Sequence, residues 1–303
     1  MSTPDPIFIL AMDHRASLVK DVYRIDGSPT PAQAATISVG KQLVFRGLQR
    51  AVADGVDRAS VGVLVDELYG AEVAREARAA GINLSMPIEQ SGRATFELEF
   101  GDLASGEWLE HVDRFDPDQV KVLVRFNPAD SEASRSAQLT DLAAVSRALA
   151  DRDRVLLLEL LVPAVAKQLE QVGGDAVAYD TDLRPALTVE VIGAMQSAGV
   201  EPDIWKIEGL ETTDAARLVV SAARQGGRDA VRCIILGRDA PVERLDHWLD
   251  VAAEAGGFSG FAIGRSIWEQ PLRQHLDDEI SDDELIAQVA QNLTHFVERY
   301  RAG

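Results

Sequence analysis

The chain of 303 residues has one cysteine, five lysines and no long apolar run. The lone Cys233 excludes a disulfide within the chain, and its place in the run Cys-Ile-Ile-Leu favours a buried structural thiol. A helix that crosses a membrane needs roughly 18 to 20 apolar residues, and no segment approaches that length. We therefore expect a soluble protein with no membrane partner.

Positive charge is also scarce, because 30 lysines and arginines face 49 aspartates and glutamates, for a formal net charge of −19. Such a chain repels nucleic acid, so we expect no nucleic-acid partner, and local cations must hold any anionic substrate. The start of the chain, Met-Ser-Thr-Pro-Asp-Pro, has neither a basic segment nor a small-residue cleavage site. This start predicts a cytoplasmic location.

Two of the five lysines, Lys121 and Lys206, lie inside apolar runs. A lysine loses its hydration shell at a cost in such a place. It responds either by pairing with a carboxylate or by lowering its pKa, which makes the amine nucleophilic. The first outcome is structural and the second is catalytic.

Eight short apolar or β-branched runs recur along the chain, and each stops at polar residues. They cover residues 7–12, 60–65, 83–86, 119–124, 155–158, 204–207, 233–236 and 260–263. Helical patterns between them cover residues 31–55, 72–80, 133–150, 183–198, 214–225, 242–255 and 282–301.

This alternation predicts an α/β fold, a single (β/α)₈ TIM barrel over residues 1–303, with its active site where the strands end. An open doubly wound sheet is the alternative. However, the turn at residues 13–15 lacks the glycine fingerprint of a dinucleotide site.

Side chains two residues apart share one face of a strand, so Lys206 should point with Glu208, and Lys121 with Arg125. Two ammonium groups inside a barrel would lower each other's pKa and allow one amine to attack a carbonyl as a Schiff-base nucleophile. The alternative is a buried lattice of ion pairs. Its members would be Lys121, Lys206, Glu159, Glu208 and Asp13.

Four carboxylates at predicted strand ends are candidates for proton transfer, namely Asp13, Glu67, Glu89 and Glu159. They could instead bind Mg²⁺ in a metal-dependent lyase or isomerase with the lysines as general acid and base, but the two lysines would compete for the carboxylate oxygens. The histidines form no close pair, which argues against zinc, and we expect neither a metal nor a cofactor. His14, at the first strand end, either hydrogen-bonds a substrate or is structural.

The last two strands each end in a Gly-Arg pair, Gly237-Arg238 and Gly264-Arg265. Glycine lets backbone amides approach an oxyanion, arginine adds a forked charge, and barrels often bind phosphate at this place. The two pairs predict a phosphorylated sugar substrate. The alternative is that both arginines pair with carboxylates at the rim.

Six segments carry a family resemblance. The sequences ILAMDHR (9–15), VDELYG (65–70), KVLVRFNP (121–128), ELLVP (159–163), DIWKIEG (203–209) and FAIGR (261–265) resemble the aldolase-like domain often fused behind a 5-dehydro-2-deoxygluconokinase in inositol catabolism. More distantly, the chain is similar to class I tagatose-1,6-bisphosphate aldolases.

The resemblance implies that Lys206 forms the Schiff base, that Lys121 and Glu159 assist proton transfer, that Asp13 holds substrate hydroxyls and that Arg265 binds phosphate. It implies cleavage of 2-deoxy-5-keto-gluconate 6-phosphate into dihydroxyacetone phosphate and malonate semialdehyde.

The chain departs from the family motif at Gln90, where the family carries a lysine. A ketose bisphosphate or a sulfonated sugar phosphate is therefore an alternative substrate. A barrel that only senses a sugar phosphate is a further alternative, because fold alone does not define function. Trp108, Trp248 and the terminal helix could supply the apolar contacts of a homo-oligomer.

Overall fold

The computed structural model describes residues 5–303. Residues 1–4, on which part of the prediction of location rests, lie outside the described residues. No helix in the described part is long and apolar enough to cross a membrane.

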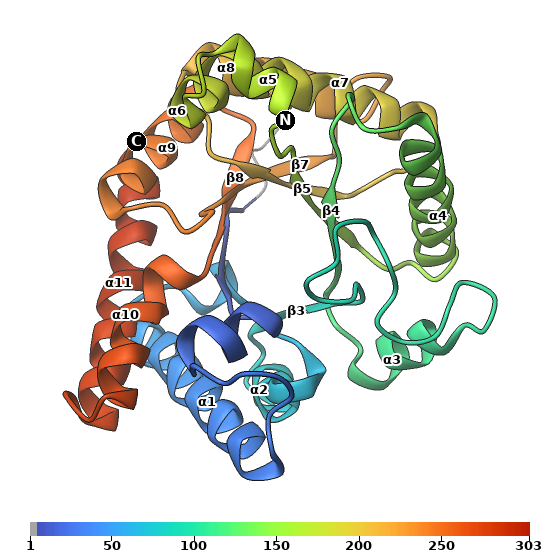
Figure 1. Ribbon diagram of the computed structural model, residues 1–303. Helices are drawn as coiled ribbons and strands as arrows, with labels where there is room; N and C mark the ends of the chain where they lie inside the picture. The colour runs from blue at the N-terminus through green and yellow to red at the C-terminus, as the bar shows by residue number, and fades with distance from the viewer. Residues whose placement is uncertain (1–4) are drawn as a thin grey trace.

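Eight parallel strands form a closed barrel in chain order, with helices around the outside (Figure 1). The strands are β1 (Ile7–Ala11), β2 (Val61–Leu64), β3 (Asn83–Pro87), β4 (Gln119–Arg125), β5 (Leu156–Leu161), β6 (Ile204–Glu208), β7 (Arg232–Leu236) and β8 (Phe258–Ile263). The barrel closes where Phe8 of β1 pairs with Phe261 of β8. The structure confirms the predicted (β/α)₈ fold.

The helices follow the strands in turn. The main ones are α1 (Pro31–Ala53), α2 (Glu67–Ala79), α3 (Glu107–Phe115), α4 (Glu132–Ala150), α7 (Arg184–Ser197), α8 (Thr213–Ala223), α9 (Val242–Ala255), α10 (Arg265–Leu276) and α11 (Asp282–Ala302). Two short helices, α5 (Ala166–Gln171) and α6 (Ala176–Ala178), follow β5.

Residues that satisfy the first free amides fix where several helices begin. The Thr30 side chain accepts a hydrogen bond from the Gln33 amide, with Pro31 at the first helical position of α1. Ser281 and Glu284 form the same reciprocal cap at α11. Both starts agree with the sequence prediction.

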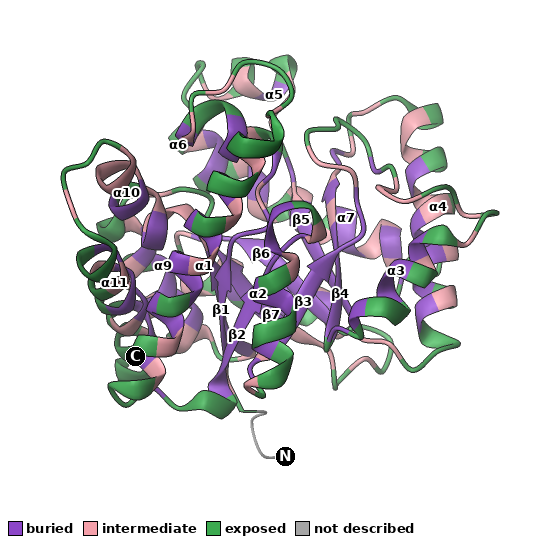
Figure 2. Cartoon of the chain, turned by 90° about the horizontal axis from the view of Figure 1, so that it is seen from below, coloured by how far each residue is buried: buried purple, intermediate pink, exposed green. Residues whose placement is uncertain are grey.

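The strands and helices of the barrel differ in burial. Most strand residues are buried, while the helices expose their outer faces (Figure 2). Inside the barrel, a separate apolar cluster fills the space below the strand ends. We call it the barrel plug, and its buried members are Ile7, Ile9, Ala11, Leu64, Leu157, Ile204, Ile234 and Ala262.

Three helix predictions need correction. The helix after β2 begins at Glu67 rather than near residue 72, because the Asp66 side chain caps it by accepting a hydrogen bond from the Tyr69 amide at 2.9 Å. Helices α3 and α10 were absent from the prediction. The α10 segment follows the turn glycine Gly264 directly and contains Pro271, which obscures its helical pattern.

Candidate active site

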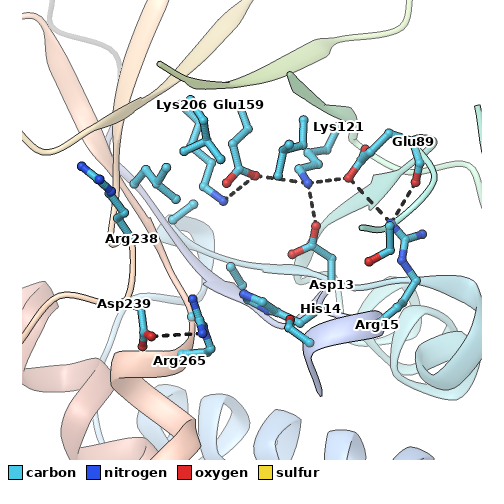
Figure 3. A pocket seen from close by; sticks show the side chains of 18 of the residues that line it. Asp13, His14, Arg15, Glu89, Lys121, Glu159, Lys206, Arg238, Asp239 and Arg265 are labelled. Carbon is cyan, nitrogen blue, oxygen red and sulfur yellow. Dashed lines mark hydrogen bonds and ion pairs between the residues drawn. The ribbon is translucent and has the colours of Figure 1, made fainter. Parts of the chain in front are cut away.

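A cavity of about 330 Å³ lies at the carboxyl ends of the strands (Figure 3). Most of the predicted site residues line it: Asp13, His14, Glu89, Lys121, Arg125, Glu159, Lys206, Gly237, Arg238, Gly264 and Arg265. They come from seven of the eight strands or from the loops that follow them. Barrel closure therefore gathers residues that lie up to about 250 positions apart in the sequence.

Lys121 of β4 is 1% exposed, and three carboxylates surround its ammonium group. Its Nζ lies 2.8 Å from Asp13 Oδ2, 2.6 Å from Glu89 Oε1 and 3.1 Å from Glu159 Oε2. Burial lowers the pKa of Lys121, but Asp13, Glu159 and Glu89 together raise it above the ordinary value. The prediction of a lowered pKa for this amine was wrong, because the three carboxylates outweigh burial.

Lys206 of β6 is also buried, at 2% exposure, but has fewer partners. Its Nζ donates to Glu159 Oε2 at 3.0 Å, which is its one ion pair within residues 5–303. Glu159 and Lys206 are register partners on β5 and β6, so the pair is set by the strand alignment. Of the two lysines in the cavity, Lys206 is therefore the less constrained.

The three carboxylates around Lys121 differ in protonation tendency. Burial raises the pKa of Glu159, but Lys121 and Lys206 lower it further, so the net shift is downward. Asp13 is shifted the same way, because Lys121, His14 and Lys206 together outweigh its burial. Burial raises the pKa of Glu89, and Lys121 and Arg15 offset this only in part. Glu159 and Asp13 are thus held ionised, whereas Glu89 is the one that favours a proton.

The centre of this carboxylate group is filled by the ammonium of Lys121 (Figure 3). Within residues 5–303, no group of three or more histidine, cysteine, aspartate or glutamate side chains is arranged to hold a metal ion. The protein supplies its own cation at the position where the three carboxylates converge.

His14 lies at the wall of the cavity beside α10. Its ring packs edge-on against Trp268, with centroids 5.6 Å apart. Burial lowers the pKa of His14 to about 4, although Asp13 opposes the shift. The imidazole is therefore neutral at pH 7, and its buried Nδ1 has no hydrogen-bond partner.

Arg265 and Arg238 stand at the end of the cavity formed by β7 and β8, and both pair with carboxylates. Arg265 lies 3.0 Å from Asp239. Arg238 lies 2.8 Å from Asp180 and 3.1 Å from Glu208. The rim pairing that the sequence left open is thus present, while both arginines still line the cavity.

The turn after β7 is strained. Arg238 and Asp239 adopt φ angles of 48° and 57°, in the left-handed region that non-glycine residues rarely enter. In the turn after β8, close packing requires glycine at position 264. A Cβ at Gly264 would lie 2.4 Å from the Ala11 carbonyl oxygen. Both turns bring backbone close to the cavity.

Two predicted residues do not line the cavity. Glu67, in the first turn of α2, contacts His111 Nδ1 at 2.6 Å and Arg114 at 2.7 Å instead. The Glu208 carboxylate is used within the protein, where it accepts a hydrogen bond from the Val162 amide at 2.9 Å and pairs with Arg238. Neither carboxylate is placed to meet a substrate in this cavity.

The cavity also contains residues that the prediction omits, chiefly Arg15, Ser17, Ser91 and Gly92. Arg15 donates to the Glu89 carbonyl at 2.8 Å and lies 3.5 Å from Glu99. Its place two residues after Asp13, in the segment that follows β1, was the available signal. Ser17 lies in a helical turn and Ser91 in a loop, and neither carries a comparable pattern.

Fold and site together define a (β/α)₈ barrel with two buried lysines and three carboxylates at the carboxyl ends of its strands. A family model matches residues 2–303, and the chain belongs to that family, described as "Uncharacterized protein conserved in bacteria (DUF2090)". No curated protein matches the chain.

Several solved structures share the fold. A crystal structure of an archaeal fructose 1,6-bisphosphate aldolase has a TM-score of 0.60 at 14% identity, covering 98% of this chain and 94% of that one. Another, in which the catalytic lysine is covalently bound to the carbinolamine intermediate of the substrate, has a TM-score of 0.55 at 15% identity, covering 95% and 94%. The fructose-bisphosphate aldolase of Slackia heliotrinireducens has a TM-score of 0.55 at 12% identity, covering 94% and 86%.

Proposed function

We propose that this protein is a metal-independent class I aldolase that cleaves a phosphorylated keto sugar or sugar acid through a Schiff base on Lys206. The observation that carries the proposal is the environment of Lys206 Nζ, which lines the cavity and has a single carboxylate partner, Glu159, at 3.0 Å. The covalent lysine intermediate of the archaeal aldolase supports it by analogy of fold.

The chemistry begins with a proton transfer. Lys206 becomes a nucleophile by losing a proton, and Glu159, held ionised by the lysines, is the acceptor within hydrogen-bond reach. The neutral amine attacks the substrate ketone to give a carbinolamine. Protonated Glu159 then returns its proton to the carbinolamine hydroxyl, which leaves as water, so that an iminium ion and an ionised Glu159 remain. The iminium then accepts the electron pair as the carbon–carbon bond breaks.

Bond cleavage requires a base that removes a proton from the hydroxyl group on the departing carbon. That carbon then leaves as an aldehyde, and the enamine left on Lys206 is protonated and hydrolysed. Glu159 serves as this base in the proposal, with Lys121 as a fixed cation that keeps its carboxylate ionised. Asp13 accepts hydrogen bonds from substrate hydroxyls while Lys121 holds it in place.

The phosphate group binds at the β7 and β8 end in this proposal. Arg265 and Arg238 provide charge, and the turns at Gly237 and Gly264 bring backbone amides close. The other lining residues predicted from the sequence, His14, Glu89 and Arg125, would contact the remainder of the substrate. Glu67 and Glu208 are not part of the proposed site.

The proposed substrate is 2-deoxy-5-keto-gluconate 6-phosphate, with a role in inositol catabolism. The support is the sequence resemblance over six strand-end segments, and Gln90 lines the cavity at the position where the chain departs from that family. A ketose bisphosphate or a sulfosugar phosphate is the alternative. A cytoplasmic location and a homo-oligomeric assembly stay predictions.

Trapping with borohydride tests the proposal. The protein is incubated with dihydroxyacetone phosphate and sodium borohydride, its intact mass is measured, and any adduct is located by peptide mapping. A reduced adduct on Lys206 is expected. No adduct on Lys206, in protein shown separately to bind the triose phosphate, would overturn the proposed mechanism.

A further inference from the structure

A third lysine, Lys41, is buried away from the cavity. It lies on the inner face of α1 among apolar residues such as Ile37 and Val44, and is 3% exposed. Its side chain runs past the bare Cα of Gly70, where an added Cβ would lie 3.7 Å from Lys41 Cδ. The proposed reaction does not use this lysine, so its burial requires another explanation.

The ammonium of Lys41 has three N–H donors, and three acceptors surround it. Nζ donates to the Met12 carbonyl at 2.6 Å, to the His14 carbonyl at 3.1 Å and to the Asp66 carboxylate. The two carbonyls bracket Asp13 in the sequence. One side chain of α1 therefore fixes the backbone just before and just after the segment that enters the site.

Asp66 connects this contact to a second helix. One of its oxygens accepts from Lys41, and the other accepts from the Tyr69 amide at 2.9 Å and caps α2. β1 ends at Ala11, so strand pairing alone does not hold residues 13 and 14. Lys41 adds an anchor for this segment at the carbonyls of Met12 and His14.

We infer that Lys41 is a positioning residue for Asp13: by holding the carbonyls of Met12 and His14, it aims the Asp13 carboxylate at Lys121. The contact that depends on it is the 2.8 Å ion pair between Asp13 Oδ2 and Lys121 Nζ. A rotation of either peptide plane would move this carboxylate and change the charge balance around Lys121. The inference rests on the proposed function for its effect on catalysis, but not for its effect on backbone order.

Two matched variants separate this role from simple stability. Lys41→Met alone leaves the Asp66 charge buried without a partner, and the protein could fail to fold. Asp66→Asn removes that charge while its amide oxygen still accepts from the Tyr69 amide, and Lys41 keeps both carbonyls. The double variant Lys41→Met/Asp66→Asn differs from Asp66→Asn in losing the ammonium group of Lys41, and with it the contact with both carbonyls and one buried positive charge.

The first measurement is the rate of borohydride trapping on Lys206 as dihydroxyacetone phosphate is varied. Asp66→Asn should stay within about threefold of the wild type. The double variant should lose at least about tenfold in maximal rate, with half-saturation changed by less than about threefold. Equal maximal rates for the two variants would overturn the inference.

The second measurement places the effect on Asp13. Residues that act through one another show non-additive effects. Two variants that both carry Asp13→Asn and Asp66→Asn are compared, one with Lys41 and one with Lys41→Met. Their trapping rates should differ by less than about twofold. A further tenfold loss in that background would show that Lys41 acts elsewhere, and would overturn the inference.

Amide hydrogen exchange provides a test that does not need the reaction. Peptides that cover residues 12–17 should exchange at least about fivefold faster in the double variant than in Asp66→Asn, with the rest of the barrel unchanged. If the wild type is never trapped, the proposed function fails while this exchange result still decides the inference. Equal exchange in both variants would overturn it.

Discussion

Glu159 and Lys206 face each other across β5 and β6, with Glu159 Oε2 3.0 Å from Lys206 Nζ and 3.1 Å from Lys121 Nζ. One carboxylate oxygen thus joins a lysine held by three acids to a lysine held by one. The arrangement assigns different tasks to the two amines, because the cation with three partners is the harder to deprotonate.

Lys206→Ala should abolish turnover of any substrate and remove the borohydride adduct, because no other amine in the cavity has so few carboxylate partners. Lys167→Ala, which removes a lysine of α5 outside the cavity, is the matched control and should keep wild-type activity. Intact mass and steady-state rates measure both. Full activity of Lys206→Ala would end the Schiff-base assignment.

Glu159→Gln should lower kcat by roughly 10²-fold to 10⁴-fold, the range for loss of a general base, with a smaller effect on KM. Glutamine keeps the shape of the side chain but cannot accept the proton. Glu97→Gln removes a half-exposed carboxylate outside the cavity lining and should change little. A kcat of Glu159→Gln within threefold of the wild type would assign the base elsewhere.

Protonation of His14 should lower the free energy of unfolding as pH falls from about 6.5 to about 4. The folded chain holds this imidazole with a pKa of about 4, below the ordinary value of 6.5, so the unfolded chain binds the proton first in that window. The free energy of unfolding therefore falls with acidification. His14→Gln should show a shallower fall in Tm between pH 6.5 and 4.5, and parallel Tm curves would contradict the prediction.

Asp239→Asn should bind inorganic phosphate about tenfold more tightly than the wild type, a gain of about 1.4 kcal/mol. The Asp239 carboxylate lies 3.0 Å from Arg265 and competes with an incoming anion for that guanidinium. Asparagine tolerates the positive φ of 57°, so the backbone is preserved. Calorimetric titration measures the affinity. The control is Asp277→Asn, since Asp277 pairs with Arg24 rather than with Arg265. Weaker binding would show that Asp239 supports the anion site.

The barrel and the two buried lysines could be predicted from sequence for the same reason. Buried parallel strands are continuous apolar runs, and a lysine within such a run stands out. The pKa of Lys121 could not be predicted, because its three carboxylates come from the segments after β1 and β3 and from β5. Only closure of the barrel shows that they meet at one atom.

The position of Glu67 away from the cavity has a local cause. Polar residues after a strand can belong to the strand end or to the next helix, and here the cap at Asp66 starts α2 at once and turns Glu67 towards His111.

Arg238 shows a different limit. Its carboxylate partner Asp180 lies in a π-helical segment after β5 that has no distinctive sequence pattern.

The barrel plug, made of apolar side chains such as Leu157 and Ile234, has a consequence for the order of events. Its apolar side chains are buried within the barrel, whereas the two lysines line the cavity at the carboxyl ends of the strands. An aldehyde released from the outer part of the substrate would leave first, and water could then reach the enamine side by the same route. In the proposed mechanism the fragment bound covalently to Lys206 would therefore depart last.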